Sequence, residues 1–104
     1  MQGTLDMLIL SCLARGQQHG FGIAEHVRRT SDDVLRVEEG SLYPALQRLE
    51  MQGHITSEWG ASANNRRARF YKLTPRGRRQ IAVEQSDWRR LVAAIDRVID
   101  PGTA

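Results

Sequence analysis

The sequence predicts a mainly α-helical fold with one small β-hairpin. Apolar residues recur at helical spacing in four segments, and the spacing changes to strict alternation over residues 55–59 and 69–73. Residues that favour helix starts and helix ends flank the helical segments at the expected places. With 104 residues, of which 40% are hydrophobic and 26% are charged, the chain has the composition of one ordinary globular domain.

The first predicted helix covers residues 4–15. Thr4 is a good N-cap, and Asp6 follows where the positive end of the helix dipole favours a carboxylate. Apolar residues lie on nearly all sides of this helix, including a stripe that contains Leu5 and Leu8. We expect the body of the protein to cover one side and a second subunit to cover the other.

A turn rich in glycine and polar residues, 16–22, precedes the second helix, and Ser31-Asp32-Asp33 breaks the pattern before the third. The second ends near Thr30, and the third begins at residue 40 or 41 and ends at Gly53, which acts as a C-cap. We expect Pro44 within the first turn of the third helix, where the missing N–H of proline costs nothing. The buried face of this helix is marked by Leu42, Ala45, Leu46 and Leu49.

The two alternating segments predict the strands of a hairpin. The loop between them, residues 60–67, is longer than a tight hairpin turn requires, and it contains the turn formers Asn64 and Asn65. It is also basic. The order helix, helix, helix, hairpin and helix is that of a winged helix-turn-helix, in which such a loop is the wing.

The last helix begins at Thr74-Pro75 and runs to about Asp100, before Pro101-Gly102. Its apolar residues repeat in a heptad-like pattern that the small body before it cannot fully cover. We therefore predict a homodimer, with residues 1–74 as the winged helix-turn-helix and 75–104 as a dimerisation helix of the same compact unit. The predicted dimer contacts are Leu5, Leu8, Ile81, Trp88, Leu91, Val92, Ile95, Val98 and Ile99.

Charge and composition exclude several classes of protein. The 15 basic residues outnumber the 12 acidic ones, and the excess gathers between residues 66 and 79, which suits a polyanion. A single cysteine, Cys12, fits a reducing cytoplasm, and the apolar stretch 5–13 is too short for a membrane span or a signal peptide. The three histidines, the serines and the glycines form no catalytic, metal-binding or phosphate-binding motif, so we expect no enzyme, no metal and no cofactor.

The predicted fold and charge favour binding to double-stranded DNA. In this fold the third helix enters the major groove, where glutamine and arginine read base edges and hydroxyls contact phosphates. The predicted contacts are Ser41, Tyr43, Pro44, Gln47 and Arg48 on that helix and Asn65, Arg66, Arg67, Arg69 and Lys72 on the wing. Two alternatives stay open: these residues form an ordinary solvated surface, or the chain is a winged-helix module that binds proteins or small molecules and does not read DNA.

Four stretches carry a resemblance to a known family: Leu5-Asp6-Met7-Leu8-Ile9-Leu10, His19-Gly20-Phe21-Gly22-Ile23, Glu39-Gly40-Ser41-Leu42-Tyr43-Pro44-Ala45-Leu46 with Arg48-Leu49-Glu50, and Tyr71-Lys72-Leu73-Thr74-Pro75-Arg76-Gly77. In this order and spacing they resemble the PadR family of transcriptional regulators over nearly the whole chain. Phe21 stands where the family often has tyrosine, which removes a hydroxyl that could contact phosphate.

The resemblance implies a cytoplasmic homodimer that binds a palindromic operator, usually as a repressor. In several members a small hydrophobic or aromatic effector releases the DNA. In drug-binding relatives a tryptophan on the last helix lines a cavity at the dimer centre, and Trp88 matches that position along the helix. Packing in the dimer seam accounts for Trp88 equally well, so both roles stay open.

Overall fold

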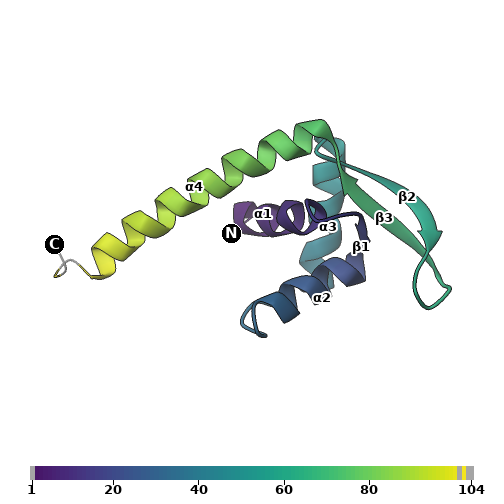
Figure 1. Ribbon diagram of the computed structural model, residues 1–104, viewed down its shortest axis with the longest axis horizontal. Helices are drawn as coiled ribbons and strands as arrows, with labels where there is room; N and C mark the ends of the chain where they lie inside the picture. The colour runs from purple at the N-terminus through teal and green to yellow at the C-terminus, as the bar shows by residue number, and fades with distance from the viewer. Residues whose placement is uncertain (1, 101, 103–104) are drawn as a thin grey trace.

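The computed structural model describes residues 2–100 and 102 of the chain. Figure 1 shows the shorter helices gathered beside a small sheet, and a long C-terminal helix that extends beyond them. The elements are α1 (Gln2–Leu13), β1 (Gln18–His19), α2 (Gly20–Thr30), α3 (Glu39–Met51), β2 (Ile55–Ala61), β3 (Arg67–Leu73) and α4 (Pro75–Ile99). The prediction of a mainly helical winged helix-turn-helix with a C-terminal helix is confirmed.

The start of α1 differs from the prediction. The helix already begins at Gln2, so Thr4 lies inside it and is not the N-cap. For the same reason Asp6 does not lie in the first turn. Its carboxylate instead has a partner on another helix, which is described with the candidate site below.

The two ends of α3 show one error and one confirmed prediction. The helix begins at Glu39, so Pro44 lies beyond the first turn, contrary to our prediction, and its nitrogen cannot donate the usual intrahelical hydrogen bond. At the other end Gly53 has a φ of +80°, which glycine adopts without steric cost. The N–H of Gly53 donates to the carbonyl of Glu50, and that of His54 donates to the carbonyl of Leu49, each at 3.0 Å. This pair of bonds is a Schellman motif.

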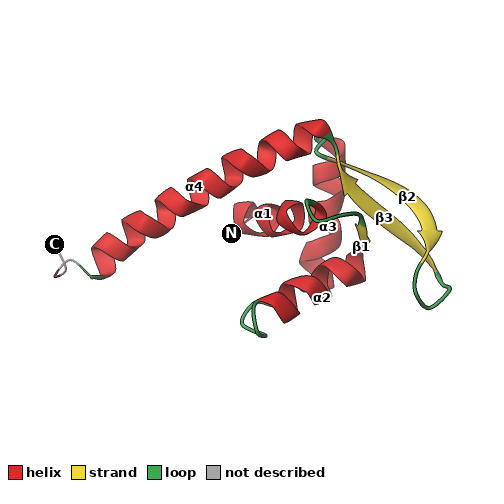
Figure 2. Cartoon of the chain, in the orientation of Figure 1, coloured by secondary structure: helices red, strands yellow, loops and turns green. Residues whose placement is uncertain are grey.

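The sheet is antiparallel with the strand order β1-β3-β2, as Figure 2 shows. The two predicted strands form the hairpin, in the register that pairs Ile55 with Leu73 and Trp59 with Arg69. Both strands are longer than predicted, because pairing continues to Ala61 and Arg67, so the predicted loop 60–67 shortens to residues 62–66. The prediction missed β1, which pairs Gln18 with Tyr71. A strand of two residues has no alternation that sequence reasoning could detect.

The long helix α4 is anchored at its first turn. The Oγ1 of Thr74 accepts a hydrogen bond from the N–H of Gly77 at 3.0 Å and donates to the carbonyl of Gly53 at 2.6 Å. The predicted cap at Thr74 is therefore confirmed, and it also joins α4 to the end of α3. The helix ends at Ile99 with Asp100 as its C-cap, which confirms the predicted end near Asp100, while Pro101 lies outside the described residues.

Helices and sheet meet in one hydrophobic core. Its members include Ile9, Leu10, Leu13, Ile23, Leu42, Leu46, Leu49, Ile55, Tyr71 and Leu73. Ile81 of α4 belongs to this core and is 8% exposed, which corrects our prediction that it lies in a dimer seam. The first turns of α4 thus complete the winged-helix body, and only the later turns extend beyond it (Figure 1).

Candidate nucleic-acid interface

One side of α3 faces solvent. Tyr43, Pro44 and Gln47 are exposed there, as predicted, because the apolar residues of α3 turn into the core. Met51 continues the same side one turn after Gln47 and is 81% exposed. Ser41 is exposed as well, but it borders a groove beside α1.

Arg48 is placed differently from our prediction. Its guanidinium donates to the carboxylate of Asp6 on α1, and its side chain is 29% exposed. The predicted outward orientation for base contacts was therefore wrong. The ion pair holds α3 against α1, and loss of Arg48 would leave the mostly buried Asp6 without its partner. Arg48 consequently has the geometry of a residue that sets the angle of α3.

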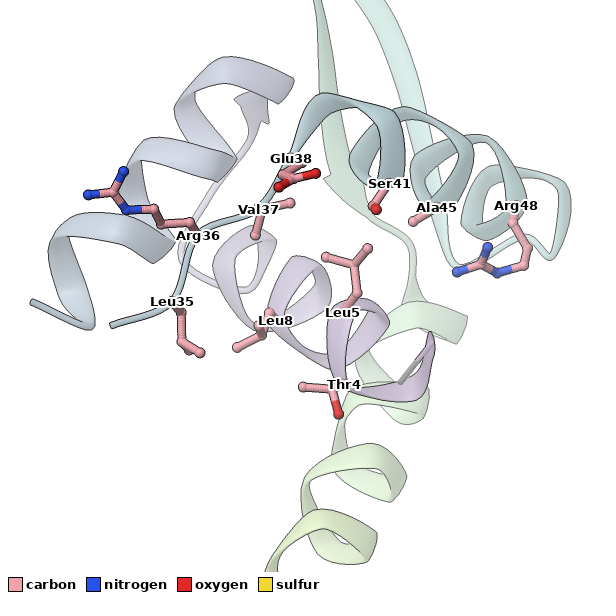
Figure 3. A pocket seen from close by; sticks show the side chains of 10 residues that line it. All are labelled: Thr4, Leu5, Leu8, Leu35, Arg36, Val37, Glu38, Ser41, Ala45 and Arg48. Atoms are coloured by element: carbon pink, nitrogen blue, oxygen red, sulfur yellow. The ribbon is translucent and has the colours of Figure 1, made fainter. Parts of the chain in front are cut away.

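A groove of about 630 Å³ runs between α1 and the segment that leads into α3. Figure 3 shows Leu5 and Leu8 of α1 on the side of that helix that faces Val37 and Ser41. Leu35 adds another exposed apolar side chain to the lining. A neighbouring side of α1 is covered by α4 of the same chain, where Gln85 donates to the Oγ of Ser11 at 3.5 Å. Leu5 and Leu8 are partly buried, and Leu5 also packs against the core, so the groove exposes only part of each side chain.

The start of α2 lies close to the exposed side of α3. A Cβ at Gly20 would come within 2.9 Å of the ring of Tyr43, so glycine permits this approach. His19 caps α2 through its Nδ1, which accepts from the N–H of Gly22 at 3.0 Å. The ring of His19 also packs edge-on against Phe70 at 5.3 Å, which ties the start of α2 to β3.

The wing is the turn between β2 and β3 together with the outer ends of both strands. Asn65 has a φ of +58°, a left-handed conformation that asparagine tolerates better than most residues. Its N–H donates to the carbonyl of Ser62 at 2.9 Å, and the N–H of Ser62 donates to the carbonyl of Arg66 at 2.8 Å. These bonds order the turn and leave Arg66 exposed at its end.

Three large side chains share one face of the wing. Trp59 lies opposite Arg69 in the register, and Arg67 lies opposite Ala61. The Cζ of Arg67 is 4.6 Å from the centre of the Trp59 ring, and that of Arg69 is 5.5 Å from it. Both distances fall within the range of a cation–π interaction. Sequence reasoning missed Trp59, because only the register shows that it stands beside the arginines.

A polar network joins this face of the wing to α3. The Oγ of Ser57 donates to the carboxylate of Glu50 at 2.6 Å, and the Nε of Arg69 donates to the Oγ of Ser57 at 2.8 Å. An Nη of Arg69 lies 3.8 Å from the same carboxylate. Glu50 follows Gln47 by nearly one turn of α3, so the network connects the exposed side of α3 with the basic wing.

Lys72 lies apart from this cluster. It pairs with Thr56, and alternation along the strand places its side chain on the other face from Arg69 and Tyr71. Tyr71 is buried in the core, and this burial raises the pKa of its hydroxyl. The predicted basic residues therefore divide among the end of the wing, one face of the hairpin and, for Lys72, the opposite face.

Cys12 is a free cysteine buried in the core. Burial raises the pKa of the Cys12 thiol, with Arg15 opposing the shift, so Cys12 packs as a neutral apolar residue. Within residues 2–100 and 102, no group of three or more histidine, cysteine or acidic side chains could hold a metal ion. Over the same residues, no helix has both the length and the apolar character that a membrane span requires.

The later turns of α4 expose the apolar residues that we predicted for a dimer seam. Trp88, Leu91 and Ile95 are exposed, and Val98 and Ile99 reach 79% and 74%. Val92 is partly buried. Trp88 and Leu91 also border a hollow of about 140 Å³ between α4 and α1, with Met7 on its other side.

The family model "Transcriptional regulator PadR-like family" matches residues 9–83. The chain is 34% identical over 77 residues to the transcriptional regulator Rv3488 of Mycobacterium tuberculosis, which covers 74% of this chain and 68% of that protein. A transcriptional regulator from Clostridium thermocellum has a TM-score of 0.83 and 30% identity, with 91% of this chain and 89% of that chain covered.

The fold is also similar to that of Bacillus subtilis PadR, whose structure was solved in complex with operator DNA. The TM-score is 0.67 at 24% identity, and the match covers 82% of this chain and 45% of that one. The related proteins are transcriptional regulators, which confirms the prediction that the chain is not an enzyme. Since the family model spans most of the chain, the protein belongs to the PadR-like family of transcriptional regulators.

Proposed function

We propose that this protein is a DNA-binding transcriptional repressor that acts as a homodimer on a palindromic operator. In this proposal α3 enters the major groove and the wing contacts the neighbouring backbone or minor groove. Membership of the PadR-like family supports the class of function, and the operator complex of Bacillus subtilis PadR supports the mode of binding.

The observation that carries the proposal is the connection between α3 and the wing. Glu50 of α3 accepts from Ser57 and pairs with Arg69, so the exposed side of α3 and the basic hairpin face belong to one surface. Duplex DNA presents base edges and phosphates side by side, which matches this arrangement.

Each exposed residue suits a particular part of the duplex. The amide of Gln47 can make paired hydrogen bonds to an adenine edge, and the hydroxyls of Ser41 and Tyr43 can donate to phosphate oxygens. Pro44 adds apolar surface beside them. On the wing we assign phosphate or minor-groove contacts to Asn65, Arg66, Arg67 and Arg69. Lys72 lies near the base of the hairpin on the other face, where we assign it a phosphate contact only.

The later turns of α4 and the groove beside α1 support the homodimer. The exposed stripe that includes Ile95 and Val98 is apolar, and so is the part of the groove lined by Leu5 and Leu8. In a two-fold dimer each copy supplies both surfaces, so every contact occurs twice. Such a dimer would place two α3 helices about 34 Å apart, one turn of DNA.

We further propose that the protein acts in the cytoplasm and that a small hydrophobic or aromatic effector releases it from DNA. Trp88 supports the effector, because its exposed ring borders the hollow between α1 and α4. A second copy packed along α4 would enclose this hollow. Packing against the second copy is the other role for the same ring.

Fluorescence anisotropy with labelled duplexes tests the DNA-binding function. The duplex is an inverted repeat found upstream of the protein's own gene, and the reference is a scrambled duplex of equal length. We expect tighter binding to the inverted repeat, with a loss of affinity of about 10³-fold between about 50 and about 200 mM salt. If no duplex binds in a salt-dependent way, the proposal fails and the chain is a winged-helix module for other ligands.

Two variants separate base contacts from phosphate contacts in this assay. Gln47→Ala is expected to reduce the preference for the inverted repeat by about 1–3 kcal/mol, while Arg66→Ala should weaken both duplexes alike and lower the salt slope by about one per subunit. Arg89→Ala makes the same change of charge on the exposed surface of α4 and is the control, with unchanged binding expected.

Tryptophan fluorescence tests the effector. The chain has two tryptophans, so in Trp59→Phe the tryptophan fluorescence comes from Trp88 alone. We expect saturable quenching of Trp88 by a flat aromatic ligand, and the same ligand should weaken binding to the inverted repeat. If none of a panel of such ligands changes the fluorescence of Trp88, the role of Trp88 is packing alone.

A further inference from the structure

We infer that Trp59 is a positioning residue of the wing, whose ring holds the guanidinium of Arg67 in place for a DNA phosphate. The inference rests on the proposed DNA-binding function and adds a role for a residue outside the predicted contacts. In this role Trp59 organises the wing of the free protein, before DNA binds.

The position of Trp59 is not explained by core packing. The residue is 55% exposed and lies toward the outer end of β2, whereas Ile55 at the start of the same strand is buried. Its ring lies beside two cations, since Arg67 and Arg69 lie 4.6 and 5.5 Å from its centre. Arg67 is the diagonal neighbour of Trp59 in the register, a distance that aromatic and long side chains can span.

The two arginines beside the ring have different surroundings. Arg69 donates to Ser57 and pairs with Glu50, so part of its charge is neutralised and its side chain is tied to α3. Arg67 belongs to none of the ion pairs found within residues 2–100 and 102. Its full positive charge therefore stays available to a phosphate.

An indole ring suits this task because it attracts a cation without neutralising it. A carboxylate in the same place would cancel the charge that DNA binding requires. A long side chain that is already held in one region loses less conformational freedom when it binds its target. Trp59 thus orders Arg67 near the outer end of the hairpin. Arg69 is held separately, by Ser57 and Glu50, closer to α3.

Trp59→Leu tests the inference, since leucine keeps apolar bulk and removes the ring. We expect the affinity for the inverted-repeat duplex to fall about twofold to fivefold for each of the two wings, the scale of an exposed cation–π interaction. The salt slope should not change, because no charge is removed. In an Arg67→Ala background the substitution should have no further effect, whereas in an Arg66→Ala background the full loss should persist.

The control variants identify the cause of any loss. Trp59→Phe keeps an aromatic face and should bind DNA nearly as tightly as the unaltered protein. Equal losses from Trp59→Leu in all three backgrounds would overturn the inference and make Trp59 a residue of general wing structure, which the thermal midpoint would also report. If Arg67→Ala weakens binding but Trp59→Leu does not, the inference alone fails. If no variant binds any duplex, the proposed function itself has failed.

Discussion

Replacing Ile95 by glutamate is expected to convert the protein from a dimer to a monomer at micromolar concentration and to weaken operator binding at least about 100-fold. Ile95 is 44% exposed on the apolar stripe of α4. In the proposed dimer this stripe is covered by the second copy, and a buried glutamate without a partner costs several kcal/mol. Two-fold symmetry introduces the change twice.

The loss of DNA binding follows from the loss of the second half-site. Two linked α3 helices bind with an affinity that exceeds that of one by a factor of about 10²–10⁴, and a monomer loses this gain. Sedimentation velocity measures the oligomeric state, and anisotropy with the inverted-repeat duplex measures the binding. Leu8→Glu in the groove beside α1 should have the same effect if that groove receives the α4 of the partner.

Val83→Glu provides the matched control. Val83 is 53% exposed on the same helix, but it points to another side from Ile95. We expect this variant to remain a dimer and to bind DNA as before. If Ile95→Glu stays dimeric, or if Val83→Glu dissociates equally well, the dimer uses a different surface from the one proposed.

Gly77→Ala is expected to destabilise the protein by about 3 kcal/mol or more, the upper end of the usual cost of overpacking. A Cβ at Gly77 would overlap the carbonyl oxygen of His54, which is backbone and cannot rotate away. That carbonyl also accepts from the N–H of Thr74 at 3.1 Å. Relief of the overlap would therefore disturb the joint between α3, the hairpin and α4.

The direction of this change is informative, because alanine is otherwise the better helix former by about 1 kcal/mol. Gly40→Ala is the control: Gly40 also lies near the start of a helix, and nothing lies within 4 Å of a Cβ built there. We expect the thermal midpoint to fall by more than about 10 °C for Gly77→Ala and to stay or rise slightly for Gly40→Ala, at equal protein concentration. If the thermal midpoint of Gly77→Ala rises instead, the backbone around Gly77 and His54 shifts without cost and the prediction is wrong.

Local signals predicted most of the fold correctly. Gly53 ends α3 and Thr74 caps α4, because each depends on hydrogen bonds within a few residues. The change from helical spacing to alternation located the hairpin for the same reason. The exposed side of α3 also followed from its own periodicity, since the buried residues of a helix determine which ones remain outside.

Some errors are local, since α1 and α3 begin earlier along the chain than predicted. The others concern partners that are distant along the chain. Arg48 pairs with Asp6, 42 residues away, and no periodicity could indicate that contact. The short strand β1 exists only because Tyr71 and Phe70 of β3 supply its partners. Trp59 gains its arginine neighbours only through the register of the hairpin.

Ile81 separates what the sequence determined from what the tertiary structure decided. The sequence by itself determined that α4 carries one continuous apolar stripe, because the repeat depends only on the order of residues along the helix. It could not determine which part of the stripe its own chain covers. The tertiary structure decided that Ile81 lies in the core and that Ile95, Val98 and Ile99 remain exposed. The reason is geometric: the body of the protein covers only the first turns of α4, and the rest of the helix extends past it.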